Sequence, residues 1–136
     1  MTDKTENGSI ISIILPTRGR TNGALQASLT SLLDNADDCS RVEIMLGVDD
    51  DDQETIDWVN NEASDFVKGY GCACKAKIFQ PLGYTKLNVY VNLLCHASTG
   101  QWLFLWNDDA LMQTKGWDTE IRSYDGQFKC LAPKDN

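Results

Sequence analysis

The sequence predicts an α/β fold in which a mostly parallel sheet is flanked by helices, and two patterns carry this prediction. Short apolar runs, rich in β-branched residues, alternate along the chain with segments whose apolar residues recur at helical spacing. Continuous apolar runs are typical of strands buried on both faces of a parallel sheet. The alternation of strand and helix implies right-handed crossovers between strands that share one direction.

The expected strands are short apolar runs that end at polar or helix-breaking residues. The first, IISIIL, ends at Pro16, and the second, VEIMLGV, ends at a run of four aspartates. A glycine-rich loop, GYGCAC, leads into a weaker third strand, and QWLFLW is the fourth. These strands cover residues 10–15, 42–48, 75–79 and 101–106, with a fifth candidate strand at 127–132.

The expected helices are the segments between these strands. Leu25, Leu29 and Leu32 lie on one face of the first helix. Acidic residues open the second helix, and the third stops near Gly100. The helices cover residues 21–36, 56–66 and 87–97, with a short fourth helix at 116–122.

Length and composition indicate one globular domain. The chain has 136 residues, of which 42% are apolar. Residues 1–9 are polar and should form a flexible tail, so that one domain covers residues 10–136. This tail lacks the apolar core of a signal peptide, and no run of about 18 apolar residues could span a membrane. A cytoplasmic protein without a transmembrane segment is therefore expected.

The charge balance constrains the ligand. The chain carries 12 basic and 20 acidic residues, a net charge of −8. A general nucleic-acid binder would show a basic face instead, so no nucleic-acid partner is expected. A phosphate ligand meeting an acidic protein needs a metal ion or local basic groups.

Five cysteines occur in the chain, and two of them form a C-x-C pair. An odd number without a signal peptide favours reduced thiols. Cys72 and Cys74 have no second pair and no nearby histidine that would complete a zinc site. We interpret them as small buried or loop residues.

Polar clusters follow each of the four strands. In parallel sheets, ligands bind beyond the carboxyl ends of the strands. These clusters should therefore face one crevice. They comprise Arg18 and Arg20 after the first strand, residues 49–52 after the second, 84–86 after the third and 107–109 after the fourth.

The acidic pair Asp108 and Asp109 has two interpretations. Adjacent carboxylates repel each other unless a positive charge sits between them. Oxygen ligands suit Mg²⁺ or Mn²⁺, which would also bridge the phosphates of a nucleotide. Acidic residues at a helix N-terminus are the equally weighted alternative. Trp106, beside the pair, is a candidate to line the site.

The four aspartates at 49–52 do not match a calcium loop, because the sixth position lacks glycine and the twelfth lacks glutamate. A phosphatase nucleophile usually follows the first strand rather than the second. Helix capping explains Asp51 and Asp52. Asp49, nearest the strand, is the better acceptor for a hydrogen bond from a base or ribose.

Positive charge at the same edge comes from Arg18, Arg20 and Lys86, which are suitable partners for a diphosphate. The absence of a G-x-G-x-x-G or Walker motif disfavours dinucleotide and P-loop sites. His96, the only histidine, is interpreted as a solvated or capping residue rather than a catalytic one.

Three segments together resemble the family 2 glycosyltransferases of the GT-A fold, which is Rossmann-like. They are ISIILPTRGR, VEIMLGVDDDDQET and GYTKLNVYVNLLCHASTGQWLFLWNDD. The resemblance covers about residues 10–117 and implies a domain that binds a nucleotide-diphospho-sugar.

The resemblance also implies roles for single residues. Pro16, Thr17 and Arg18 match the segment that touches base and ribose. Asp49 matches the aspartate that binds the base, and Lys86 a basic position near the diphosphate. The full set of nucleotide-binding candidates is Pro16, Thr17, Arg18, Arg20, Asp49, Asp51, Lys86 and Asp108.

The NDD segment matches the DXD motif of this family, with Asn107 at its first position. The resemblance implies that Asp109 is a ligand of Mn²⁺ or Mg²⁺, and that Asp108 contacts the ribose. Asp108 is also a candidate metal ligand, beside Asp109.

The chain departs from the family after this motif. Family members continue for about a hundred residues through an acceptor-binding half that carries the general base, whereas 27 residues follow Asp109 here. The acceptor half is therefore expected to be absent and the base unassigned. The carboxylates available after the motif are Asp118, Glu120, Asp125 and Asp135, and none lies in a matching context. Apolar surface left open by this absence should favour a homodimer.

The expected function is that of an inverting glycosyltransferase that binds a UDP- or GDP-linked sugar through a divalent metal. It would transfer the sugar to an acceptor hydroxyl. One alternative is a non-catalytic or truncated nucleotide-sugar-binding module that needs a partner. The other is a Mg²⁺-dependent nucleotidyl or phosphoryl transferase.

Overall fold

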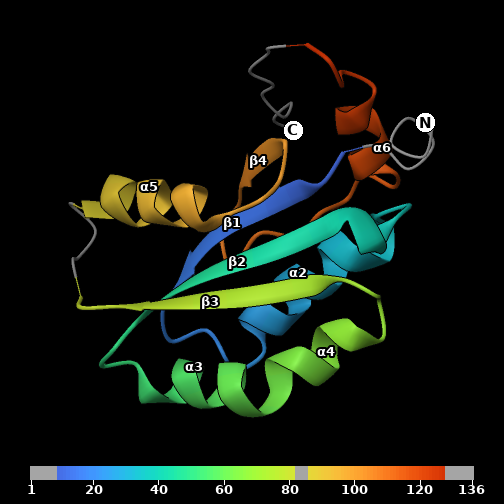
Figure 1. Ribbon diagram of the computed structural model, residues 1–136. Helices are drawn as coiled ribbons and strands as arrows, with labels where there is room; N and C mark the ends of the chain where they lie inside the picture. The colour runs from blue at the N-terminus through green and yellow to red at the C-terminus, as the bar shows by residue number, and fades with distance from the viewer. Residues whose placement is uncertain (1–8, 82–85, 128–136) are drawn as a thin grey trace.

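The computed structural model describes residues 9–81 and 86–127, which form a four-stranded sheet with helices on both faces (Figure 1). All three strand pairs are parallel, and the strand order is β3-β2-β1-β4. The strands are β1 (Ile11–Thr17), β2 (Val42–Asp49), β3 (Ala73–Phe79) and β4 (Trp102–Leu105). The predicted α/β class and parallel sheet are confirmed.

Helices fill the connections between the strands. They are α2 (Ala24–Asn35), α3 (Gln53–Trp58), α4 (Ser64–Lys68), α5 (Leu87–Ala97) and α6 (Trp117–Arg122). A 3-10 turn at Cys39–Arg41 precedes β2, and a π-helical segment at Val59–Ala63 joins α3 to α4. Within the described residues, no helix is long and apolar enough to cross a membrane.

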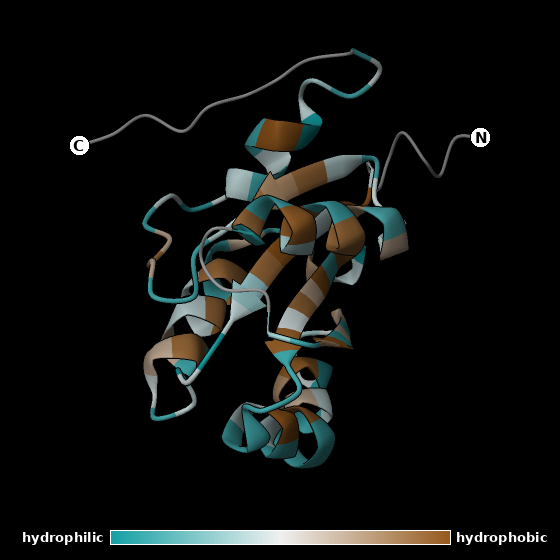
Figure 2. Ribbon diagram, turned by 90° about the vertical axis from the view of Figure 1, so that its left-hand side faces the viewer, coloured by the Kyte–Doolittle hydropathy of each residue, from teal (hydrophilic) through white to brown (hydrophobic). Residues whose placement is uncertain are grey.

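The two faces of the sheet have separate cores. Ile11, Ile13 and Leu15 point to one side, where they pack with residues of α2, α3 and α4. Ile14 points to the other side and belongs to a smaller cluster with Leu94 of α5. This alternation is the period of two expected for a strand. Figure 1 shows α5 on the opposite side of the sheet from α2, α3 and α4, and Figure 2 shows the hydrophobic bands along the strands between the helices.

The strand order creates a switch point beside β1. The chain passes from β1 to β2 to β3 in one direction, and α5 then carries it back across the sheet to β4. The helix after β1, α2, and the helix before β4, α5, therefore lie on opposite faces of the sheet. Ligands in open parallel sheets bind at such a point, beyond the carboxyl ends of the strands.

Element boundaries differ from the prediction for identifiable reasons. The first helix begins at Ala24 rather than residue 21, because Gly23 has a φ of 129°, which is not helical. The second begins earlier, at Gln53, because the Asp52 side chain accepts a hydrogen bond from the Thr55 N–H. β3 begins at Ala73, inside the predicted glycine-rich loop. Residues 128–132 of the fifth candidate strand lie outside the described residues.

The amino edge of the sheet is closed by a buried ion pair. Asp118 of α6 is fully buried and accepts hydrogen bonds from the backbone N–H groups of Asp37 and Asp38, at 2.7 and 2.9 Å. Arg122 lies 2.6 Å from the same carboxylate. Burial alone would raise the pKa of Asp118, but these hydrogen bonds and Arg122 outweigh it, so the pKa lies below its ordinary value.

Replacement of Asp118 by Asn should cost roughly 3 kcal/mol of unfolding free energy, because it leaves Arg122, whose side chain is only 9% exposed, without its counter-charge. Urea denaturation at neutral pH measures the loss. Glu120→Gln, on the exposed face of the same helix, is the control and should cost little. Since the folded pKa of Asp118 is lowered, its contribution is present above the unfolded pKa of about 4 and is lost at more acidic pH. Equal stability of both variants would contradict this account.

Candidate functional site

Asp49 is the centre of a polar cluster at the carboxyl edge of the sheet. It is the last residue of β2 and is only 8% exposed. One carboxylate oxygen, Oδ1, accepts a hydrogen bond from the Tyr90 hydroxyl of α5. The other, Oδ2, accepts one from Arg18 Nη1 at 2.7 Å. The buried carboxylate is therefore held by donors from two different elements.

Arg18 joins Asp49 to Asp51. Its guanidinium donates to both oxygens of Asp51, at 2.6 and 3.3 Å, in addition to its contact with Asp49. The hydrogen bond from Arg18 lowers the pKa of the Asp51 carboxyl, and the two aspartates raise the pKa of Arg18. Both Arg18 and Asp51 side chains are about half exposed, so a ligand can reach this ion pair.

Asp108 forms a second cluster on the other side of β1. Thr17 Oγ1 donates to its Oδ2 at 2.8 Å, and Arg20 Nε lies 3.5 Å from its Oδ1. The Asp108 side chain is 15% exposed. The segment that follows β1 thus contacts both acidic clusters, with Arg18 turned toward β2 and Arg20 toward β4.

The four aspartates at 49–52 divide their roles differently from the prediction. Asp52 caps α3 and also accepts a hydrogen bond from the backbone N–H of Gly19 at 2.8 Å, so its capping role is confirmed. Asp51 is not the cap: its carboxylate binds Arg18 instead. The two neighbours differ because an N-cap side chain must reach the free N–H groups of the first helical turn, as Asp52 does.

The acidic pair after β4 does not cap a helix. The next helix in the described chain, α6, begins only at Trp117. Asn107 and Asp109 are exposed in a turn closed by a hydrogen bond from the Ala110 N–H to the Asn107 carbonyl, 3.2 Å long. The helix N-cap interpretation of this pair is therefore wrong.

Trp106 anchors the segment that carries Asp108 and Asp109. Its indole N–H donates to Ser28 Oγ of α2 at 2.8 Å, and its backbone N–H donates to the Ile14 carbonyl of β1 at 3.1 Å. Ser28 Oγ also donates to the Asn107 carbonyl at 3.3 Å. The carboxyl end of β4 is thus fixed to both β1 and α2.

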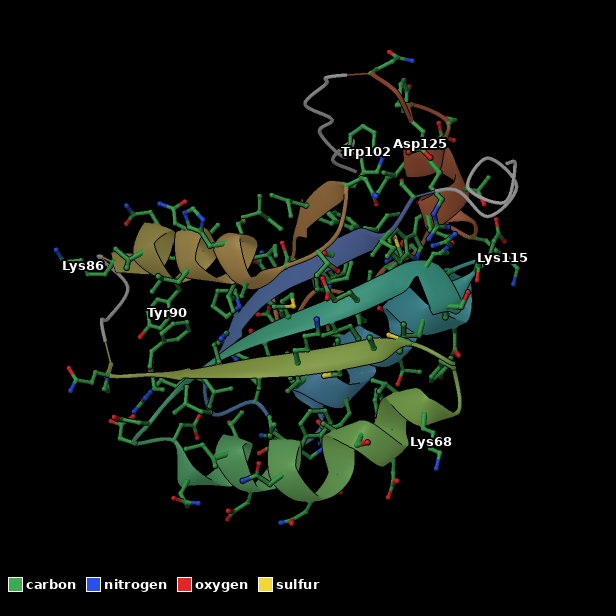
Figure 3. The ribbon with its side chains drawn as sticks, viewed as in Figure 1. Lys68, Lys86, Tyr90, Trp102, Lys115 and Asp125 are labelled. Carbon is green, nitrogen blue, oxygen red and sulfur yellow. The ribbon has the colours of Figure 1, made fainter. Side chains whose placement is uncertain are left out.

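Lys86 and Pro16 complete the predicted residues. Lys86 is exposed at the start of α5, at the same end of the helix as Tyr90 (Figure 3). Within the described residues it forms no ion pair. Pro16 is half-buried in β1, where it lies in register with Gly47. Neither side chain belongs to the hydrogen-bonded clusters around Asp49 and Asp108.

The protein alone offers few metal ligands at this edge. Among residues 9–81 and 86–127, no group of three or more His, Cys, Asp or Glu side chains is arranged to hold a metal ion. The Asp109 carboxylate is exposed and makes no hydrogen bond or ion pair within these residues. It fits a hard cation whose other ligands are phosphate oxygens and water, as is common for Mg²⁺.

The two cysteines of the C-x-C pair and His96 are the other residues that could carry site chemistry. Burial raises the pKa of Cys72 to about 12 and that of Cys74 to about 11, so both thiols are protonated in the metal-free protein, and among the described residues they belong to no group of three or more potential metal ligands. His96 lies in the last turn of α5 and lines a shallow groove with Lys77 and Phe79.

Tyr90 is the residue that the sequence analysis missed. It lies four positions before Leu94, and these two are the buried residues of α5. A hydroxyl in an apolar stripe needs a buried partner. That partner, Asp49, is 41 residues away in sequence, and only the return of α5 across the sheet brings the two together.

No family model matches the sequence, and none of the curated proteins is detectably similar to it. What this chain does must therefore be inferred from the geometry of the carboxyl edge.

Proposed function

We propose that the chain binds a nucleoside-diphosphate sugar and is the donor-binding part of an inverting, family 2-like glycosyltransferase of the GT-A fold. One observation carries the proposal. The segment after β1 lies between two carboxylates, Asp49 and Asp108, and contacts each through a different arginine. This arrangement sits at the switch point of the sheet, where an elongated nucleotide can lie across the strand ends.

The nucleoside would bind on the β2 side. Asp49 retains unused lone pairs, since a carboxylate can accept about four hydrogen bonds and two are already made. It is thus suited to accept an N–H from a base. The wall beside the nucleoside would be formed by Pro16, Thr17 and Arg18. Asp108, which accepts a hydrogen bond from Thr17, would contact a ribose hydroxyl.

The diphosphate would lie near Arg20, Lys86 and Asp109. A divalent cation, Mn²⁺ or Mg²⁺, held by Asp109 with Asp108 would neutralise the phosphates and stabilise the departing nucleoside diphosphate. The basic side chains add positive charge that the acidic protein otherwise lacks. Arg20 is only loosely paired with Asp108, at 3.5 Å, and can shift toward a phosphate.

Transfer to an acceptor needs a general base, and two of the three described carboxylates after Asp109 have structural roles, while the third, Glu120, is exposed on α6. Asp118 is buried against Arg122. Asp125 accepts hydrogen bonds from Ser9 and from the Trp102 indole, at 2.6 and 2.7 Å (Figure 3). Both lie toward the amino edge of the sheet. This observation favours the second candidate function, a nucleotide-sugar-binding module that acts with a partner chain.

Binding should raise the melting temperature of the protein when UDP or GDP is added with Mn²⁺. A ligand at a hundred times its Kd stabilises the folded state by about 2.7 kcal/mol. Thermal melts with each nucleotide, with and without metal, measure the shift. Preference for triphosphates, or turnover of phosphate esters, would instead support a nucleotidyl or phosphoryl transferase. The proposal fails if no nucleoside diphosphate changes the midpoint under either condition.

Two matched substitutions should separate nucleoside binding from metal binding. Asp109→Asn should abolish the dependence on Mn²⁺, because an amide is a poorer ligand for a hard cation. Asp49→Asn should weaken nucleotide binding while leaving the metal requirement intact. Calorimetric titration of UDP at several Mn²⁺ concentrations distinguishes the two effects. Equal, metal-independent losses in both variants would argue against the assigned roles.

The chain should also self-associate through β4. Within the described residues this strand pairs only with β1, and its outward-facing Leu103 and Leu105 are 46% and 58% exposed. Open strand edges beside apolar side chains favour pairing with a second copy, most often as a symmetric dimer.

Light scattering over a range of concentrations should therefore show a dimer, and Leu105→Lys should shift it toward the monomer. Leu111→Lys is the control, because Leu111 is also 58% exposed but lies outside the sheet. A wild-type monomer at every concentration, or equal effects of both substitutions, would contradict pairing through β4.

A further inference from the structure

We propose that Tyr90 is a positioning residue for recognition of the base. Its hydroxyl sets the orientation in which Asp49 accepts a hydrogen bond from a nucleobase N–H. This inference rests on the proposed function and adds to it a residue and a physical reason for the base preference.

Contacts among three elements, α5, β2 and β3, hold Tyr90 in the site. Its side chain reaches from α5 to the last residue of β2, and it is only 6% exposed. Its ring packs edge-on against Phe79, with ring centroids 5.3 Å apart and an interplanar angle of 85°. Phe79 ends β3 and lies in register with Asp49. The ring is therefore fixed by packing, and the hydroxyl has little freedom to leave the carboxylate.

The two donors on Asp49 are not equivalent. Arg18 is half exposed and shares its guanidinium with Asp51, so an approaching ligand can displace it. The Tyr90 hydroxyl is buried, where a hydrogen bond to a charged acceptor is stronger than in water. When the ligand arrives, Tyr90 is thus the donor that keeps the carboxylate plane in place.

A fixed carboxylate selects bases by the proton on their pairing edge. Uracil and guanine present a ring N–H there, which the carboxylate accepts. Cytosine presents a bare ring nitrogen, whose lone pair faces the carboxylate and is repelled. The preferred ligands are therefore uridine or guanosine diphosphates, and the preference over a cytidine diphosphate depends on how firmly Asp49 is held.

The test compares Tyr90→Phe with Tyr70→Phe in calorimetric titrations with UDP and with CDP, both in the presence of Mn²⁺. Tyr70 is a matched control, because its hydroxyl also binds an aspartate, Asp34, at 2.8 Å, and its ring packs on Phe66. The loss of a hydrogen bond to a charged group should weaken UDP binding by Tyr90→Phe about tenfold. CDP binding should change much less, so the preference for UDP falls. Tyr70→Phe should leave both affinities unchanged.

The outcomes separate this inference from the proposed function. If the wild type binds no nucleoside diphosphate, the proposed function fails. If the wild type prefers UDP and Tyr90→Phe keeps the same affinity and preference, the role of Tyr90 is overturned while the proposed function stands. Equal losses for UDP and CDP would assign Tyr90 a general structural role and also overturn the inference.

A second measurement applies even if Tyr90→Phe does not fold. Tyrosines of the wild-type chain can be replaced by 3-fluorotyrosine, which keeps both the ring and the hydroxyl. Saturating UDP should shift the fluorine resonance of residue 90, and CDP at the same occupancy should shift it less. The resonance of residue 70 should not move. An unchanged resonance of residue 90 with UDP bound would overturn the inference.

Discussion

The central position of β1 is the constraint on which the remaining structure depends. β1 is hydrogen-bonded on one side to β2 and on the other to β4, and its side chains enter both cores. The residues that follow it can therefore touch clusters on both neighbouring strands. Arg18 and Arg20 are two positions apart in sequence, yet each serves a different carboxylate. A β1 at the edge of the sheet could not join the two clusters.

Glu43 near the amino edge differs in burial from Asp51 and Asp109 at the carboxyl edge, and for these three carboxylates the difference separates a structural role from candidate binding roles. Glu43, near the amino edge, is buried. It accepts hydrogen bonds from the hydroxyls of Ser12 and Thr99 and forms an ion pair with Lys75. Burial would raise its pKa, but these partners lower it overall. Such a network is satisfied internally and offers nothing to a ligand. At the carboxyl edge, Asp51 and Asp109 remain exposed to solvent, so a cation or a nucleotide can reach them.

Much of the fold could be predicted because the strands are continuous apolar runs and the helices have a regular apolar stripe. What failed depends on backbone detail or on distant contacts. The late start of α2 follows from the φ of Gly23, which composition does not reveal. Of the two residues expected to cap the helix, Asp52 does so and Asp51 does not, a difference of one residue at a helix end, where sequence patterns are least informative. Tyr90 was missed because its partner, Asp49, lies on β2, 41 residues earlier in the sequence.

The candidate site was predictable as a location more than as a set of contacts. Polar residues after successive parallel strands must meet at one edge, so the grouping of Thr17, Arg18, Asp49 and Asp108 follows from topology. Their pairing does not, because each arginine could have turned to either neighbouring strand. That pairing matters for an acidic protein with a net charge of −8. Arg18 already pairs with Asp49 and Asp51 and offsets one of their two negative charges, so an incoming anion meets a guanidinium rather than two bare carboxylates. The ion pairs of the free protein thereby lower the electrostatic cost of bringing a diphosphate to an acidic surface.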